Sequence, residues 1–143
     1  MDHPEISGFI GSQIVATVCC SENDLPYCFN CYYSFISDSA LLVFKSSLGT
    51  RHEEILSKNR KVAGTIIPKD IDVAVIRGVQ FQGIVLPDSF DLSMKASTSY
   101  YLAFPFAAAI PGKLYVISLN VVKFTDNTKG FGYKSHWNRP AAG

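Results

Sequence analysis

LLVFKSSLGTRHEEILSKNRKVAG, residues 41–64, is the stretch that decides the fold. It predicts a strand over 41–44, a polar elbow over 45–49, a helix over 50–59 and a further strand that starts near Val62. Thr50 stands at the N-cap position and Glu53 follows three residues later, which is the pattern of a capping box. A strand, an elbow and a capped helix therefore follow one another within 24 residues.

The first turn of this helix is a candidate anion site. A helix N-terminus carries unpaired N–H donors and a partial positive charge, which together favour a bound phosphate. The side chains that would add to it are Ser46, Ser47, Thr50, Arg51 and His52. A capping box also satisfies two donors without any ligand, and Glu53 offsets part of the positive field. The pattern therefore also fits a helix that binds nothing.

Composition limits the classes of function. The chain has 143 residues, of which 48% are hydrophobic and 17% charged, so we expect one folded domain over residues 1–143. A net charge of +1 does not predict the broad positively charged surface with which proteins bind nucleic acid. No apolar run approaches the roughly 20 residues of a membrane helix, and the N-terminus does not resemble a signal peptide. We expect a cytoplasmic protein without nucleic-acid or membrane partners.

Four cysteines lie close together in the sequence, at positions 19, 20, 28 and 31. Cys28-x-x-Cys31 resembles half of a zinc site. Phe29 and Asn30 nevertheless belong to a strand-like run without Gly or Pro, and residues three apart in a strand point to opposite faces. The spacing therefore favours ordinary buried thiols over a metal site or a disulfide.

The other predicted elements are mostly strands. The expected strands are 13–20, 27–36, 61–67, 72–86 (one long strand or a bent pair) and 113–124. A tight turn at 37–39 joins 27–36 to 41–44 as a hairpin. Gly78 and Gly83 would allow the bending that a barrel needs. Gln80 and Gln82 lie on the same face of their strand, and this face is either exposed to solvent or contacts a ligand through the amide groups.

Two further helices and a polar tail complete the chain. A short helix at 4–11, in an N-terminal segment 1–12, has to pack on the sheet because it is too short to be stable alone. A second helix is expected over 89–103, with a buried stripe of Phe90, Met94 and Tyr101. The tail, 125–143, contains the only Trp of the chain. Together these elements predict a mainly β protein, a small antiparallel barrel with peripheral helices.

Several motifs in order resemble the pyridoxamine 5′-phosphate oxidase-like split barrels. They are Phe44-Lys45-Ser46-Ser47-Leu48-Gly49-Thr50-Arg51-His52, then an apolar helix, Asn59 and Val62-Ala63-Gly64-Thr65-Ile66. The strand Gly78-Val79-Gln80-Phe81-Gln82-Gly83 matches the next strand of that family, which also closes on Gly. The tail is similar to a small, poorly characterised bacterial branch of it.

The resemblance implies a homodimer of six-stranded antiparallel split β-barrels, with flavin mononucleotide (FMN) in each of two clefts at the dimer interface. Its phosphate-binding positions fall on Ser46, Thr50, Arg51 and His52, with Lys45 close by. The run Asn30, Cys31, Tyr32 and Tyr33 would lie along the isoalloxazine ring, and Gln80 or Gln82 would approach it. The resemblance further implies that the tail docks at the interface, where Lys134 and Trp137 close the cleft of the partner.

Two departures from the oxidase pattern bear on function. His52 stands where the oxidase usually has a second basic residue, so phosphate affinity would be weaker and pH-dependent. The residues with which the true oxidase holds pyridoxal phosphate have no match here. The resemblance therefore implies a family member other than the oxidase itself.

The leading hypothesis is an FMN-binding flavoprotein, an oxidoreductase or flavin reductase whose substrate the sequence does not name. No general base, nucleophile or metal ligand set is legible. The alternative is a non-catalytic carrier or sensor on the same barrel that binds flavin or haem, with His52 or His136 as the candidate axial ligand. A third hypothesis is a dimeric interaction domain without a ligand.

Overall fold

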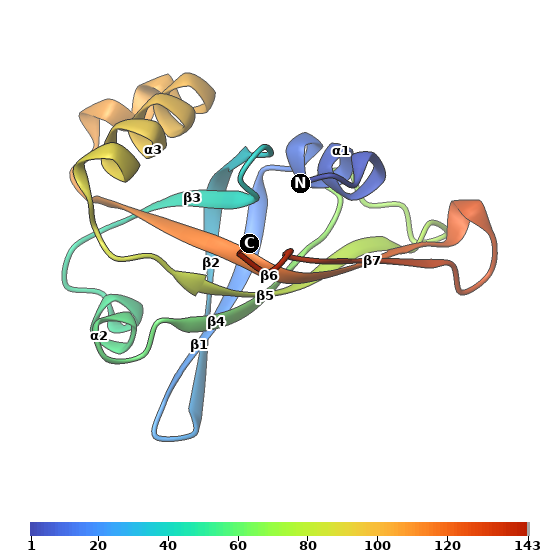
Figure 1. Cartoon of the computed structure of the whole chain (residues 1–143), viewed down its shortest axis with the longest axis horizontal. Coiled ribbons are helices and arrows are strands. Elements are labelled where there is room, and N and C mark those ends of the chain that lie inside the picture. The colour runs from blue at the N-terminus through green and yellow to red at the C-terminus, as the bar shows by residue number, and fades with distance from the viewer. Residues whose placement is uncertain (143) are drawn as a thin grey trace.

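A computed structural model describes residues 1–142 and shows an antiparallel β-barrel with helices around it (Figure 1). The barrel strands are β1 (Val15–Glu22), β2 (Leu25–Ile36), β3 (Leu41–Ser46), β4 (Lys61–Ile66), β5 (Arg77–Val85) and β6 (Lys113–Asp126). They pair in the order β3-β2-β1-β4-β5-β6, and β3 also pairs with β6, which closes a ring of six strands. The predicted split-barrel fold class is confirmed.

The apolar run of β3 explains why this stretch organises the barrel. Leu42 and Phe44 point into the barrel, where they join the main core. Leu41 and Val43 point outward and pack against Ala96 and other residues of a second apolar cluster. Because both faces are covered, the strand is hydrophobic at successive positions instead of alternating.

Two helices pack against the barrel core. α1 (Pro4–Ser12) buries Ile6, Phe9 and Ile10 in that core, and the Phe9 ring lies 4.9 Å from the ring of Phe124. α2 (Arg51–Lys58) buries Ile55 and Leu56 in the same core. Both predicted helices are confirmed. The burial of α1 supplies the packing that so short a helix requires.

α3 (Phe90–Ala103) is also confirmed, but its predicted buried stripe is correct only for Tyr101, which packs against the second apolar cluster; Phe90 and Met94 are exposed. It lies outside the barrel and packs against β3 and β6 through Ala96 and Tyr100. Phe90 is 79% exposed and Met94 56% exposed. The small side chain of Ala96 lets the helix approach the sheet closely, which turns the larger side chains outward. A 3-10 helix, η1 (Pro105–Ala109), leads from α3 toward β6.

The strand expected over 72–86 is shorter than predicted, because β5 begins only at Arg77. The side chain of Asp72 accepts a hydrogen bond from the N–H of Ala74, and its carbonyl accepts one from Val75. This turn diverts the chain from an extended conformation, and Ile71, Val73 and Ile76 stay exposed. The expected bend is present at Gly83, where the pairing of β5 with β6 shifts register. A Cβ at Gly83 would come within 2.5 Å of the Ser118 carbonyl oxygen.

The tail contains a strand that the sequence analysis did not predict. After η2 (Asn127–Lys129), β7 (Lys134–Asn138) pairs with β6, and the β6–β7 hairpin extends to one side of the barrel (Figure 1). Trp137 is 7% exposed and belongs to the barrel core. Its indole Nε1 donates to the Asp2 carboxylate at 2.9 Å, which connects the two ends of the chain.

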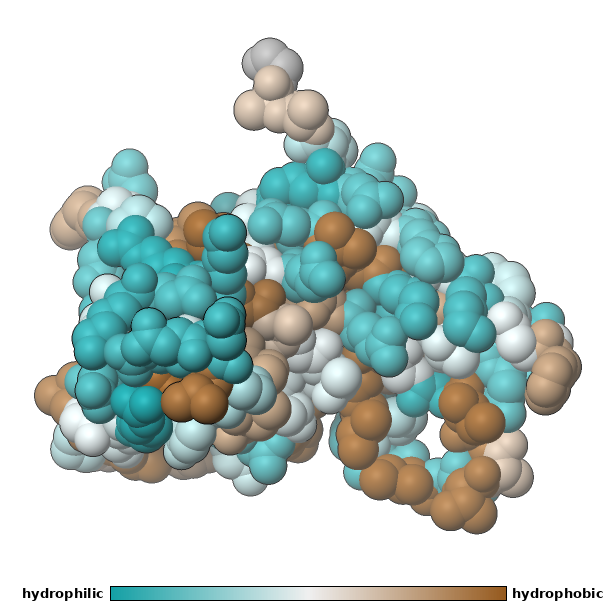
Figure 2. Space-filling view, turned by 90° about the horizontal axis from the view of Figure 1, so that it is seen from below, coloured by the Kyte–Doolittle hydropathy of each residue, from teal (hydrophilic) through white to brown (hydrophobic). Residues whose placement is uncertain are grey.

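Polar side chains cover much of the surface, and apolar ones occur in separate groups, as the face in Figure 2 shows. Within residues 1–142, no helix combines the length and the hydrophobicity that crossing a membrane would require.

Candidate functional site

The elbow between β3 and α2 is built as the sequence predicts. The Thr50 hydroxyl accepts the N–H of Glu53 at 3.2 Å. The Glu53 carboxylate accepts the N–H of Gly49 at 3.0 Å, so the reciprocal bond goes to the residue before the cap. Gly49 has a φ of 78°, which a residue with a side chain rarely adopts. The cap does not use the N–H groups of Arg51 and His52.

His52 and Ser46 form the closest polar pair of this site. The His52 Nε2 and the Ser46 Oγ are 2.5 Å apart, and the imidazole stacks on the ring of Phe29 with centroids 3.9 Å apart. Burial lowers the pKa of His52 below its ordinary value, and the nearby Glu53 carboxylate opposes this only in part. The imidazole is therefore neutral at pH 7, and offers a hydrogen bond instead of a charge. The sequence analysis did not predict this pair.

The two cations of the elbow already have partners within the chain. Arg51 Nη1 lies 3.4 Å from a Glu22 carboxylate oxygen and 3.3 Å from one of Glu54. Lys45 Nζ donates to the Ala107 carbonyl at 2.8 Å and lies over the Tyr101 ring. The sequence analysis did not predict the contact with Glu22, which is 29 residues away and is brought close only by the packing of α2 on β1.

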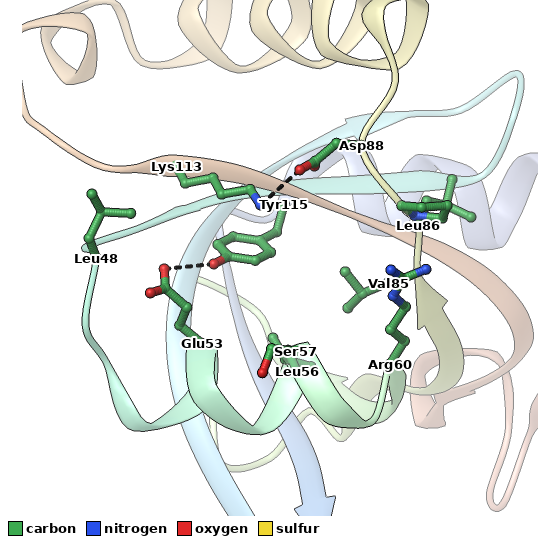
Figure 3. Close-up of a pocket in the computed structure, with 11 residues that line it drawn as sticks. Leu48, Glu53, Leu56, Ser57, Arg60, Val85, Leu86, Asp88, Lys113 and Tyr115 are labelled. Carbon is green, nitrogen blue, oxygen red and sulfur yellow. Dashed lines mark hydrogen bonds and ion pairs between the residues drawn. The ribbon is translucent and has the colours of Figure 1, made fainter.

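A pocket of about 450 Å³ lies between α2 and β6 (Figure 3). Tyr115 donates its hydroxyl to the Glu53 carboxylate at 2.9 Å, and Lys113 forms an ion pair with Asp88 at 2.9 Å. The hydrogen bond from the Gly49 N–H, and then that from Tyr115, lowers the pKa of Glu53. Glu53 is therefore ionised and fully occupied by the cap and by Tyr115, which fits a structural role better than a catalytic one.

The outer face of the sheet carries the predicted glutamines. Gln80 and Gln82 are exposed on β5 and line a cavity of about 500 Å³ together with His136 and other side chains from five strands. On the same face the Thr17 hydroxyl donates to the Asn30 side-chain oxygen at 2.7 Å. Sequence spacing does not bring His136 near Gln80; the pairing of β6 with both β5 and β7 does.

Successive residues of a strand point to opposite faces, so residues 30–33, which were expected to lie together along the flavin ring, are split between two faces. Asn30 and Tyr32 are exposed on the outer face. Cys31 and Tyr33 point inward, where Cys31 packs against the core and the Tyr33 hydroxyl donates to the Ile10 carbonyl at 2.6 Å. Burial raises the pKa of the Cys31 thiol to about 12. Cys31 and Tyr33 therefore do not share a surface with the other two.

Of the remaining predicted site residues, Ser47 belongs to the elbow and is exposed, whereas Lys134 and Trp137 lie apart from it. Lys134 is exposed on β7 opposite Thr125. Trp137, described above, is enclosed within its own barrel and so does not project toward a partner. The site residues thus form an elbow group and an outer-face group, with Cys31, Tyr33 and Trp137 inside the core.

Comparisons of sequence find close relatives over nearly the whole chain. The chain is 37% identical over 138 residues to a UPF0306 protein of Serratia proteamaculans (strain 568), covering 96% of each chain. It is 37% identical over 134 residues to a UPF0306 protein of Photorhabdus laumondii, covering 94% of each. No protein-family model matches the chain.

Comparisons of structure find the same fold in proteins of low sequence identity. A haem-binding protein from Mycobacterium smegmatis has a TM-score of 0.77 at 16% identity; the match covers 94% of this chain and 56% of that one. An FAD-binding protein from Mesorhizobium loti has a TM-score of 0.67 at 17% identity, covering 88% and 95%. A Clostridium acetobutylicum protein of the pyridoxinephosphate oxidase family has a TM-score of 0.64 at 15% identity, covering 94% and 92%.

Proposed function

The chain belongs to the UPF0306 protein family and has the split-barrel fold, and from this premise we propose that it binds a flavin nucleotide, FMN, beside the elbow. The observation that carries the proposal is the position of the capped N-terminus of α2 at the end of β3. There His52 stacks on Phe29 of β2, whose outer face presents Asn30 and Tyr32. Structural neighbours named as FAD-binding or as members of the pyridoxinephosphate oxidase family support a flavin as the ligand.

The residues of the elbow fit a terminal phosphate. The Ser46 hydroxyl, the His52 imidazole and the N–H groups that the cap leaves unused are donors of the kind that phosphate oxygens accept. Both carboxylates paired with Arg51 belong to exposed ion pairs, and such pairs contribute about 0–1 kcal/mol. Arg51 can therefore exchange them for a phosphate at little cost. Lys45, held by Ala107, would add positive charge from its present position.

A bound flavin would supply electron transfer, and the chain's own residues would bind and orient it. Asn30, Gln80 and Gln82 offer amide groups on the outer face of the sheet. We propose an oxidoreductase or flavin reductase function on this basis, without assigning a catalytic residue.

Titration with three flavins tests the phosphate site. We expect FMN to bind at least tenfold more tightly than riboflavin, which lacks the phosphate, as measured by quenching of flavin fluorescence. FAD tests whether the site accepts a longer nucleotide. Equal affinity for FMN and riboflavin would overturn the phosphate assignment, and failure of all three to bind would overturn the flavin proposal. Anaerobic reduction of the bound flavin by NADH or NADPH then separates an enzyme from a carrier.

We further propose that two copies form a homodimer through the outer face of β4, β5 and β6. This face holds the cavity lined by Gln80 and Gln82, and Val121 beside them is 37% exposed. A partner covering this face would enclose the cavity.

Haem is the second candidate ligand, because His136 lines the same cavity. His52 is less suited to a haem iron, since its Nε2 is already bonded to Ser46. The likeness to a haem-binding protein supports the alternative. If it holds, haemin added to the protein will give a sharp Soret band that His136→Ala abolishes and His52→Ala preserves.

A further inference from the structure

Two thiols face each other across the first hairpin of the barrel. β1 and β2 pair antiparallel in a register that sets Cys19 directly opposite Cys28. Both are free thiols; Cys28 is exposed and Cys19 half-buried. They line the cavity of the outer face, near the part of the β1–β2 hairpin that projects beyond the sheet (Figure 1).

The turn of this hairpin sets the register. Asn23 and Asp24 have φ values of 51° and 62°, which are the two left-handed residues of a type I′ turn between Glu22 and Leu25. At the other end of the hairpin, the Tyr33 N–H donates to the Ile14 carbonyl at 3.0 Å. Hydrogen-bonded and non-hydrogen-bonded pairs alternate along an antiparallel ladder.

The pairs at the two ends of this ladder, Glu22–Leu25 and Ile14–Tyr33, are hydrogen-bonded. Cys19 is an odd number of positions from both Glu22 and Ile14, so Cys19 and Cys28 form a non-hydrogen-bonded pair. The Cα atoms of such a pair lie about 4.5 Å apart and their side chains share one face. A disulfide needs a Cα separation of about 4.4–6.8 Å. The pair falls within this range at its short end, where a disulfide is strained and readily reduced.

The other two cysteines are placed differently. Cys20 is 2% exposed and its Sγ contacts the Tyr27 carbonyl oxygen at 3.5 Å. Cys31 points into the core, as described above. Of the four thiols of the chain, only Cys19 and Cys28 lie opposite each other on a face that a small oxidant can reach.

We propose that Cys19 and Cys28 are a redox-active dithiol that closes to a cross-strand disulfide when the protein meets hydrogen peroxide. The Cys28 thiolate attacks one peroxide oxygen and releases hydroxide, which leaves a sulfenic acid on Cys28. The Cys19 sulfur then displaces the sulfenic hydroxyl and loses its proton, forming the S–S bond. In total two thiols and one peroxide give one disulfide and two waters, and a dithiol reductant reverses the reaction.

The roles within the pair follow from exposure. Cys28 is the exposed thiol and so meets the peroxide first. The hydrogen bond with Cys28, and then burial, raises the pKa of the Cys19 thiol above its ordinary value. Cys19 therefore stays protonated while Cys28 attacks, and acts as the resolving thiol. The chemistry needs only the two thiols and peroxide, but Cys19 and Cys28 line the cavity that the proposed dimer would cover, so a partner or ligand seated there would slow the oxidation.

Thiol counting by mass spectrometry tests the proposal. The reduced protein is treated with equimolar hydrogen peroxide, denatured and alkylated. We expect untreated protein to take up four alkyl groups and oxidised protein two, with a Cys19–Cys28 cross-linked peptide after digestion. Dithiothreitol should restore four. Cys31→Ser is the matched control, and should still lose two alkylatable thiols.

The single variants complete the test. Cys19→Ser should stop at a sulfenic acid on Cys28, trapped by dimedone, and form no cross-link within the chain. Cys28→Ser should keep its three thiols alkylatable under the same treatment. A wild-type protein that keeps all four thiols, or a disulfide that maps to Cys20, to Cys31 or between two chains, would overturn the proposal.

Discussion

His52 shows how a single residue acquires its chemistry from contacts that the sequence does not display. By sequence it is a titratable group at a helix N-terminus. In the structure it stacks on Phe29 and hydrogen bonds to Ser46, which the barrel brings together from β2 and β3. Burial at this position lowers its pKa, so that phosphate recognition at this elbow would rely on Arg51 for charge.

Arg51→Ala should weaken FMN binding at least tenfold, because a charge-assisted hydrogen bond to phosphate contributes on the order of 1.5–3 kcal/mol. Lys58→Ala is the matched control: Lys58 pairs with the same two carboxylates, Glu22 and Glu54, but from the other end of α2. Dissociation constants from fluorescence titration provide the comparison. Equal losses in both variants would assign the effect to the ion pairs instead of the phosphate.

His52 should also make stability depend on pH. Its folded pKa lies below the ordinary 6.5, so the unfolded chain binds its proton more readily. The contribution of His52 to the free energy of unfolding is then fully present above pH 6.5 and is lost as the pH falls toward the folded pKa. Urea unfolding of wild type and His52→Gln at a series of pH values measures it.

The stability difference between wild type and His52→Gln should shrink or reverse on acidification. His136→Gln, at an exposed position, serves as the control for the substitution of histidine by glutamine itself. A difference between wild type and His52→Gln that stays constant with pH would contradict the assignment.

At the scale of elements, the predictions succeeded where local pattern decides and failed where packing decides. The α2 cap and the bend at Gly83 follow from residues adjacent in sequence. The buried face of α3 does not, because an apolar side chain is buried only if another element covers it. Exposed Phe90 and Met94 lie on a face that no element of residues 1–142 covers.

Gly64 of β4 should be intolerant of any side chain. It lies opposite Phe81 on β5, and a Cβ would come within 2.3 Å of the Phe81 ring and 2.5 Å of the Thr17 carbonyl oxygen. Gly64→Ala should therefore cost about 1–3 kcal/mol of unfolding free energy. Gly8→Ala in α1, where a Cβ meets nothing within 4 Å, should stabilise the protein by about 0.5–1 kcal/mol. Urea titrations of both variants and of the wild type measure these differences in the free energy of unfolding.

β7 should be part of the stable fold. Trp137 is buried in the barrel core, so Trp137→Ala should cost about 3–5 kcal/mol. Asp2→Asn keeps a hydrogen-bond acceptor for the indole and should cost far less. Chemical unfolding measures both. Wild-type stability in Trp137→Ala would show that the tail is dispensable, and would restore its predicted role as a free arm that docks on a partner.

At the scale of the whole molecule, helices cover the outer face of the closed ring of six strands only in part over residues 1–142. The core fills the inside, α3 covers β3 and part of β6, and the outer face of β4 and β5 keeps Gln80 and Gln82 exposed. This is the face through which we propose that two copies associate.

The protein should therefore have a solution mass of about twice its 15.7 kDa, as measured by light scattering coupled to size-exclusion chromatography. Val121→Lys introduces a charge on the proposed interface and should shift the mass toward that of one chain. Leu102→Lys, on the exposed side of α3, should leave it unchanged. A monomeric wild type would refute the dimer.

The family resemblance implied the split barrel and the phosphate positions Ser46, Thr50, Arg51 and His52, which stay a prediction. The sequence patterns alone determined the mainly β class of the fold, the two short helices and the capped elbow. These depend on periodicity and on neighbours within a few positions, which a linear pattern records. Only the tertiary structure decided that Cys31 and Tyr33 point inward, that Glu22 pairs with Arg51, and that Trp137 belongs to the core. Each of these depends on strand register or on contacts between residues far apart in the chain, and the closing of the barrel sets them.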